Sequence, residues 1–154
     1  MKKYLLTFLI ALVIGFFLSN FFLKQYEDFD GIKVSNKGEN LYFIQYGVFS
    51  SLENLEENTI NLQNYVYNKE DNLYYVYVGI TQDKENAFKI VNYFKDLGYE
   101  TTMKEFGITN KDFLNELVNY DEILKNTNDV TAISSIINQV LMKYEEVVIS
   151  GGKN

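Results

Sequence analysis

The chain has 154 residues, enough for one domain of ordinary size and short appended segments. It carries a formal net charge of −7 and contains neither cysteine nor histidine, which excludes disulfides, thiolate metal sites and a histidine general base. Asp, Glu, Lys, Ser and Tyr remain as candidate catalytic groups, but no nucleophile or metal signature stands among them. We therefore expect no metal, no cofactor and no enzyme.

The first predicted element is a membrane-spanning helix over residues 4–23, preceded by a short cytoplasmic stub. The stretch YLLTFLIALVIGFFLSNFFL has no charge, and at 1.5 Å rise per residue it spans about 30 Å, the thickness of the bilayer hydrocarbon. Two lysines precede it and acidic residues follow it, which predicts a cytoplasmic N-terminus and an extracytoplasmic remainder. The alternative is a cleaved signal peptide, which the length of the stretch and the lack of a small-x-small cleavage site disfavour.

Residues 24–40 are predicted to be a polar tether, at most about 60 Å long when stretched, that holds a folded domain close to the membrane. Beyond residue 24 the chain has 11 lysines and 21 acidic residues, a net charge of −10. Such a surface repels nucleic acid and anionic lipid headgroups. We expect a partner that is neutral, cationic, or recognised by shape and stacking, and no nucleic acid.

A phrase at the start of the predicted domain is repeated 32 positions later. LYFIQYGVFSSLEN at 41–54 aligns with LYYVYVGITQDKEN at 73–86. Each copy reads as a strand that runs into a helix start. Ser50 with Glu53 fits a capping box in the first copy, and Asp83 fits an N-cap in the second. The doubled phrase predicts two strand–helix units.

Shorter segments complete these two units. They are helices over 52–64 and 84–97, strands over 65–67 and 100–106, and a turn over 68–72. Gly98 is placed to end the second helix. The order is β-α-β-β-α-β, so we expect an α+β, ferredoxin-like domain over 41–106, with a four-stranded antiparallel sheet and the two repeated strands at its centre.

Alternation along the repeated strands predicts two different faces of the sheet. The face assigned to a helix-covered core carries Tyr42, Ile44, Tyr46, Val48, Tyr74, Val76, Val78 and Ile80. The opposite face, predicted to be open, carries Phe43, Gln45, Gly47, Phe49, Leu73, Tyr75, Tyr77 and Gly79. Its rings and single amide suit stacking and hydrogen bonding of a ring-shaped ligand. The alternative is that later helices cover this face.

The two phrases resemble the SPOR domain of bacterial envelope proteins over residues 41–106. IQYGVFS at 44–50 follows the opening pattern of that family, in which a glutamine lies in the first strand. VYVG at 76–79 matches the second strand, and GY at 98–99 matches a later turn. The chain departs from the family where GIT replaces Gly-Pro-Phe at 79–81, where Tyr77 replaces the usual arginine, and in having no tryptophan.

The resemblance implies binding of septal peptidoglycan, on glycan strands stripped of their stem peptides, through the sheet face. The family's glutamine and serine fall on Gln45 and Ser50. Together with the predicted open face, this gives six candidate glycan-binding residues: Gln45, Phe43, Phe49, Ser50, Tyr75 and Tyr77. We therefore expect a membrane-anchored, non-catalytic peptidoglycan-binding protein of cell division or sporulation.

Residues 107–154 lie beyond the resemblance and are predicted to form a helical hairpin and tail. Thr109 or Asn110 caps the first helix, the turn lies around Thr127 and Asn128, and both helices carry an apolar stripe. The hairpin either packs on the domain or itself, or binds a partner. The alternative function is therefore an exported interaction module that recruits an envelope or divisome protein through these helices.

Overall fold

The computed structural model describes residues 38–150. The membrane helix predicted at 4–23 and nearly all of the predicted tether lie outside this part of the chain. Between residues 38 and 150, none of the helices combines the length and the apolar character needed to cross a bilayer.

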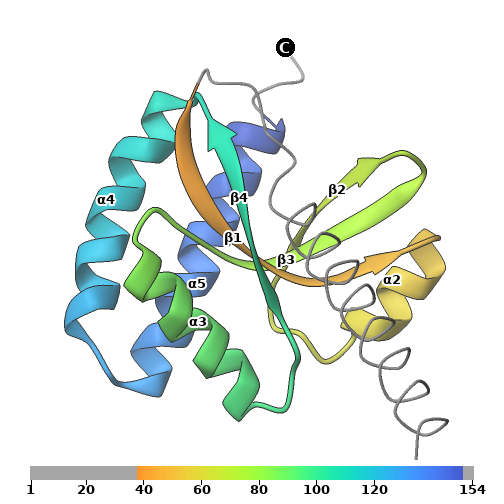
Figure 1. The fold of residues 1–154 in the computed structure, drawn as a ribbon, viewed down its shortest axis with the longest axis horizontal. Coiled ribbons are helices and arrows are strands. Elements are labelled where there is room, and N and C mark those ends of the chain that lie inside the picture. The colour runs from red at the N-terminus through yellow and green to blue at the C-terminus, as the bar shows by residue number, and fades with distance from the viewer. Residues whose placement is uncertain (1–37, 151–154) are drawn as a thin grey trace, which may run out of the picture. The chain divides into compact units, whose positions relative to one another are not determined.

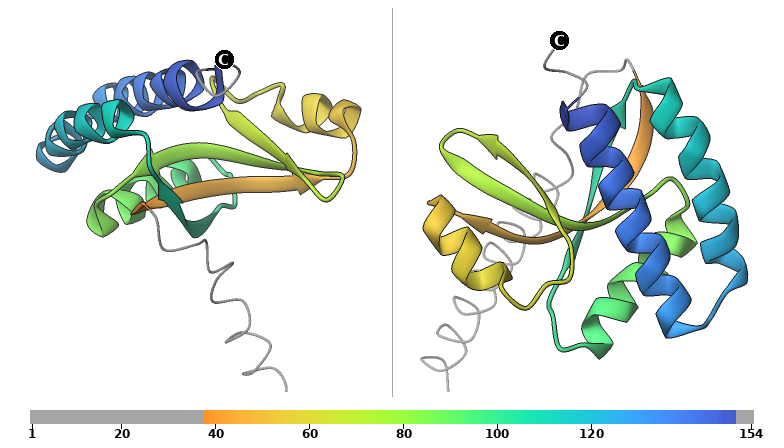
Figure 2. Two further views of the ribbon diagram at one scale, coloured as in Figure 1. Left: turned by 90° about the horizontal axis from the view of Figure 1, so that it is seen from above. Right: turned by 180° about the vertical axis from the view of Figure 1, so that it is seen from behind.

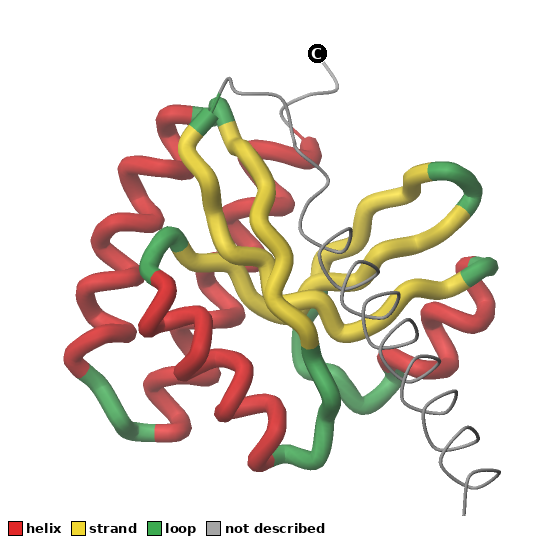
Figure 3. The backbone as a smooth tube through the Cα atoms, in the orientation of Figure 1, coloured by secondary structure: helices red, strands yellow, loops and turns green. Residues whose placement is uncertain are grey.

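The described chain folds into one four-stranded sheet with helices packed on it (Figures 1 and 3). The elements are β1 (Glu39–Phe49), α2 (Leu52–Thr59), β2 (Val66–Glu70), β3 (Leu73–Thr81), α3 (Lys84–Asp96), β4 (Thr102–Ile108), α4 (Lys111–Asn126), α5 (Val130–Tyr144) and the π-helical η1 (Glu145–Ser150). The sheet order is β2-β3-β1-β4, and every neighbouring pair is antiparallel. The predicted β-α-β-β-α-β order and the central position of the two repeated strands are confirmed.

The starts of the two helices in the repeat differ in how well they were predicted. Asp83 caps α3 as expected, since its side chain accepts from two backbone N–H groups of the first turn, at 2.7 and 3.1 Å. Helix α2 is capped by Ser51, whose Oγ accepts from the Asn54 N–H at 3.2 Å. The helix begins at Leu52 as predicted, but the predicted capping box of Ser50 and Glu53 is wrong, because the N-cap is Ser51.

The connection from α2 to β3 is also shifted from its predicted bounds. Helix α2 ends at Thr59 instead of continuing to residue 64, and β2 runs on to Glu70. The turn contracts to Asp71 and Asn72, which have φ angles of 49° and 64°. Two positive φ angles in a two-residue loop are what a tight hairpin with right-handed strand twist requires. Strand β4 likewise begins at Thr102, two residues later than predicted.

The ends of α3 and the C-terminal hairpin follow the sequence closely. Gly98 has φ of 86°, and the Tyr99 N–H donates to the Phe94 carbonyl at 2.9 Å, so the predicted helix stop is confirmed. Asn110 caps α4, with its side chain accepting from the Phe113 N–H at 2.9 Å. The hairpin turns between Asn126 and Val130, where the sequence placed it.

Strands β1 and β3 do not alternate regularly along their whole length. The pairs across the irregularity are Ile44 with Gly79, Gln45 with Tyr77, and Gly47 with Val76. Tyr46 and Val78 are skipped in this pairing, so each strand carries one extra residue at the same level. Bulges of this kind re-aim the side chains that follow them. Because each strand has one extra residue, the pairing register is the same on both sides of the bulge. On each strand, however, the side chains beyond the bulge point to the opposite face from the one that regular alternation would give.

The reversed pleat redistributes the two predicted faces. Tyr77 keeps the face predicted for it and packs against Phe43, with the two ring centroids 5.3 Å apart. Gly79 instead faces α3, where a Cβ added to it would lie 2.7 Å from Ile90 Cγ2. Ile80 was assigned to the same face as Ile44, but it lies directly opposite Phe43 and so shares the face of that ring. The predicted division of β3 between the two faces is therefore wrong for Gly79 and Ile80, whereas Tyr77 lies on the predicted face.

The face predicted to be open is largely covered by α5. Helix α3 and helix α5 lie on opposite sides of the central strands (Figure 2), and the ring of Tyr144 in α5 lies 5.4 Å from that of Phe43. Phe43 is 2% exposed and Tyr77 is 7% exposed. Both residues were expected on an open surface, and this expectation is wrong. The apolar stripe of the hairpin needs a face to bury, and the aromatic side of the sheet supplies it.

Candidate functional site

Beyond the reach of α5, part of the aromatic face remains accessible. Tyr75 lies directly opposite Val48 on β1 and Asn68 on β2, and Gln45 lies diagonally from it, opposite Tyr77. Val48 is 42% exposed, and Gln45 and Tyr75 are half-buried. We call Gln45, Val48, Asn68 and Tyr75 the open end of the sheet.

The amide of Gln45 is available to a ligand. No hydrogen bond joins its side chain to any other residue between 38 and 150, and it is not among the buried polar groups of that segment that lack a partner. It therefore keeps two N–H donors and a carbonyl acceptor within reach of solvent. Within β1, Gln45 is the amide paired with both neighbouring strands, opposite Tyr77 of β3 and Thr102 of β4.

The remaining two candidates lie elsewhere. Phe49 is paired with Tyr74, on the opposite side of the sheet from Gln45, and its ring lies 6.4 Å from that of Tyr46. The Tyr46 hydroxyl donates to the Asn58 carbonyl of α2 at 3.1 Å, which fixes this group on the α2 side. Ser50 is exposed at the end of β1, and its Oγ accepts from the Asn54 side chain at 3.4 Å.

The six predicted glycan-binding residues therefore do not form one surface. Gln45 and Tyr75 meet at the open end of the sheet, Phe43 and Tyr77 are buried below α5, and Phe49 faces the other side. Ser50 is accessible but belongs to the start of α2. The bulge moves Phe49 to the other face, and α5 covers Phe43 and Tyr77, which stay on the face of Gln45.

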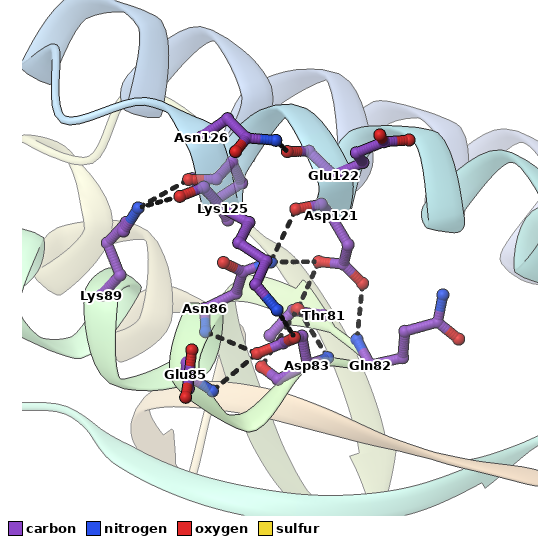
Figure 4. Close-up of polar contacts among 11 residues, drawn as sticks. Thr81, Gln82, Asp83, Glu85, Asn86, Lys89, Asp121, Glu122, Lys125 and Asn126 are labelled. Atoms are coloured by element: carbon purple, nitrogen blue, oxygen red, sulfur yellow. Dashed lines mark hydrogen bonds and ion pairs between the residues drawn. The ribbon is translucent and has the colours of Figure 1, made fainter.

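A buried polar cluster that the sequence analysis did not identify joins α4 to the end of β3 (Figure 4). Asp121 is 6% exposed, and it accepts from the Thr81 hydroxyl, from the Gln82 N–H at 2.9 Å and from the Asn86 amide at 3.2 Å. The Asn86 amide also donates to the Asp121 carbonyl at 2.9 Å. We call these four residues the Asp121 cluster.

A lysine extends this junction along α3. The Lys89 ammonium donates to the carbonyls of Leu124, Lys125 and Thr127 at 2.7, 3.2 and 2.8 Å. These carbonyls belong to the end of α4, where a cation is favoured by the helix dipole. The cluster and Lys89 together fix α4 to the β3–α3 junction and hold the hairpin in place.

Electrostatics indicate that Asp121 is structural. Burial raises the pKa of its carboxyl above the ordinary value, and the hydrogen bonds from Thr81, Gln82 and Asn86 oppose that rise. Both carboxyl oxygens are already engaged by protein donors, so neither faces a cleft where a substrate could lie. A sequence signal existed: Asp121 occupies an inward position of α4, between Leu117 and Leu124, where an apolar residue is expected.

Metal binding finds no support in the described chain. Between residues 38 and 150 there is no group of three or more acidic, histidine or cysteine side chains placed to hold an ion. The buried tyrosines are also unsuited to proton transfer. Burial raises the pKa of Tyr77 and of Tyr144 above that of a free phenol, so both stay protonated at neutral pH.

Comparisons with known proteins give little beyond this geometry. No protein-family model matches the chain, and no curated protein matches it at a significant level. Among solved structures, the chain is similar to the peptidoglycan-binding domain of the B. subtilis cell wall lytic enzyme CwlC, with 21% sequence identity and a TM-score of 0.39. The match covers 46% of this chain and 95% of that one. At this identity and structural overlap we take no function from the match.

Proposed function

We propose that this protein is a non-catalytic peptidoglycan-binding protein with a SPOR-type, ferredoxin-like domain that recognises glycan strands stripped of stem peptides. The observation that carries the proposal is the amide of Gln45. It occupies the glutamine position of the phrase at 44–50, reaches solvent, and has no hydrogen-bond partner among residues 38–150. Tyr75 beside it supplies a ring at the same surface.

The chemistry of the ligand fits this surface. A stripped glycan strand is uncharged apart from its lactyl carboxylates, so its recognition depends on hydrogen bonds and ring stacking. The open end of the sheet offers amides from Gln45 and Asn68 and the ring of Tyr75. The acidic character of the chain beyond residue 24 disfavours polyanionic ligands such as nucleic acid.

Helix α5 narrows the proposed site. Phe43 and Tyr77 cannot contact a glycan while Tyr144 packs against Phe43. We therefore assign contact to Gln45 and Tyr75, and assign Phe43 and Tyr77 to the core. Few contacts imply weak binding to a single short glycan, which a membrane anchor beside the cell wall offsets by local concentration.

The location in the cell is part of the same proposal. We infer that residues 4–23 anchor the chain in the cell membrane, with the domain outside, where it meets the wall at sites of division or sporulation. The support is the uncharged stretch and the lysines that precede it.

A retention experiment on purified sacculi tests the function. The full chain is incubated with sacculi that an amidase has stripped of stem peptides, and with untreated sacculi. We expect greater retention on the stripped wall, and a loss for Gln45→Ala on the order of tenfold, the effect of one or two hydrogen bonds to the ligand. The matched control is Asn119→Ala, which removes an exposed amide from α4.

Two outcomes would contradict the proposal. One is equal retention on stripped and untreated sacculi. The other is a Gln45→Ala variant that is retained like the unmodified chain and the Asn119→Ala control.

The alternative function assigns a protein partner to α4 and α5. Their apolar stripes are used within the described domain: Phe113, Leu117, Ile137 and Leu141 are buried in the core. The large apolar residues left exposed on this hairpin, Val118, Ile123, Val130 and Met142, are single side chains of the kind that ordinary surfaces carry. No observation favours a partner over the glycan.

A further inference from the structure

Two adjoining hollows lie on the surface between α3, α5 and the loop that follows α2. One has a volume of about 280 Å³ and the other about 500 Å³. Both are lined by Gln63, Tyr93, Ser134 and Asn138, so they form one continuous groove. In the view from behind, the loop after α2 and the end of α3 lie beside α5 (Figure 2). We call this surface the amide groove.

No charged side chain lines either hollow within the described chain. This is unusual for a protein with 11 lysines and 21 acidic residues beyond residue 24. A phosphate, a carboxylate or a cation would enter the groove without an opposite charge to compensate its loss of hydration. The groove therefore fits a neutral ligand.

The hydrogen-bonding groups of the groove are only partly engaged. Gln63 Oε1 accepts from the Ser134 hydroxyl at 3.0 Å, which leaves the two N–H donors of that amide unused. The backbone carbonyl of Asn138 accepts from the Asn64 amide at 3.4 Å, and no described residue bonds to the Asn138 side chain. The same holds for the Tyr93 hydroxyl. Donors and acceptors thus line the groove without charge.

The floor of the groove is apolar. Phe94 and Ile137 are buried beneath it, and Tyr93 and Tyr99 contribute rings at its sides. A pyranose ring presents C–H groups on its faces, and an N-acetylated sugar adds hydroxyl and acetamido groups at the edge of the ring. The groove suits such a ring because it has an apolar floor, aromatic sides and free amides.

We propose that the amide groove is a second carbohydrate-binding site, for a neutral oligosaccharide that carries N-acetyl groups. It is built from α3, α5 and the loop after α2, and it shares no residue with the open end of the sheet. The choice of an N-acetylated glycan rests on the proposed function; affinity for a neutral oligosaccharide rests on the groove alone. Two sites on one domain would raise the avidity for a long glycan strand above that of either site.

Binding of chitohexaose, a neutral N-acetylglucosamine hexamer, tests the groove. The full chain is held in a detergent without a sugar headgroup and titrated by calorimetry. We expect saturable binding, and a loss of about tenfold or more in affinity for the double variant Gln63→Ala and Asn138→Ala, which removes at least two ligand hydrogen bonds. Alanine favours the helical state at position 138 and Gln63 is exposed, so the fold is retained.

Asn119→Ala is the matched control for a lost amide on an exposed helix, and Gln45→Ala reports the sheet site. Chitohexaose binding that is absent, or that the double variant leaves unchanged, overturns the groove. If sacculus retention still depends on Gln45 in that case, the proposed function stands and only the second site fails. If retention is independent of Gln45 while chitohexaose binding needs the groove, the sheet site fails and the groove stands.

Discussion

A single carboxylate decides how the C-terminal hairpin sits on the sheet. Asp121 interrupts the apolar stripe of α4 and is nonetheless buried, because Thr81, Gln82 and Asn86 supply it with donors. Leaving any of these donors unpaired in the interior costs about 1–3 kcal/mol. The cluster therefore favours the position of α4 in which all of these donors are paired.

The variant Asp121→Asn tests this role. It keeps the shape of the side chain but turns one acceptor oxygen into an amide that faces a donor, so we expect the unfolding free energy to fall by about 1–3 kcal/mol. The measurement is urea denaturation of the variant beside Asn119→Ala, which lies on the same helix with its side chain exposed and should change little. An unaltered midpoint for Asp121→Asn would contradict the structural role.

The same variant reports the pKa of Asp121. Because burial raises this pKa in the folded state, the folded chain holds the proton to a higher pH than the unfolded chain does. The contribution of Asp121 to stability is thus greatest at acid pH and is lost as pH rises through the folded-state pKa. The advantage of the unmodified chain over Asp121→Asn should shrink as the pH rises from the ordinary carboxyl pKa through the raised one. An advantage that grows over this range would show a lowered pKa instead.

At the scale of elements, the paired bulge in β1 and β3 decides which side chains meet which helix. On one side of the bulge, the pair of Ile44 and Gly79 faces Ile90 of α3. Beyond it, Tyr46 and Phe49 face α2 while Gln45 stays on the other side. The two glycines of the repeated phrase therefore have different surroundings, although the sequence presents them as equivalents.

Alanine substitutions separate these two glycines. A Cβ at Gly79 would lie 2.7 Å from Ile90 Cγ2, a branched side chain held in the core, so Gly79→Ala should destabilise the domain by about 1–3 kcal/mol. At Gly47 the nearest atom is Phe49 Cζ at 2.8 Å, at the tip of a half-exposed ring that can move aside. Gly47→Ala should therefore be nearly neutral in thermal unfolding. Equal losses at both positions would contradict the asymmetry that the bulge creates.

At the scale of the whole molecule, the hairpin completes the core of the domain. The buried cluster joins Leu41 and Phe43 of β1 to Phe113 of α4 and Leu141 of α5. A sheet of four strands with helices on one side would leave its aromatic face in water, and α5 supplies the missing layer. The site that remains is consequently at an end of the sheet rather than across its face.

The arrangement of the chain in the membrane can be tested because it has no cysteine of its own. The variant Asn119→Cys places one thiol on the exposed side of α4. We expect a membrane-impermeant maleimide to label it in intact cells, and the protein to remain with the membranes after a carbonate wash. Labelling that requires cell lysis would contradict an extracytoplasmic domain.

The sequence by itself determined the order of the elements, the central position of the repeated strands, the Asp83 cap, the Gly98 stop and the hairpin turn. These depend on residues close together in the chain, such as a side-chain oxygen that accepts from the next turn or a glycine that adopts positive φ. Such local features can be predicted from the sequence because they do not depend on tertiary contacts.

Only the tertiary structure decided the pleat of β1 and β3, the fate of Phe43 and Tyr77, and the burial of Asp121. Each depends on contacts between surfaces that lie far apart in the chain. Gly47 and Gly79 follow the two skipped residues, but a glycine in a strand can also mark a close approach of backbone, so it does not fix the pleat. An apolar stripe does not say which face will cover it. The free energy gained by burying the aromatic face under α5 determines which face of the sheet is covered, and alternation along a strand does not contain that information.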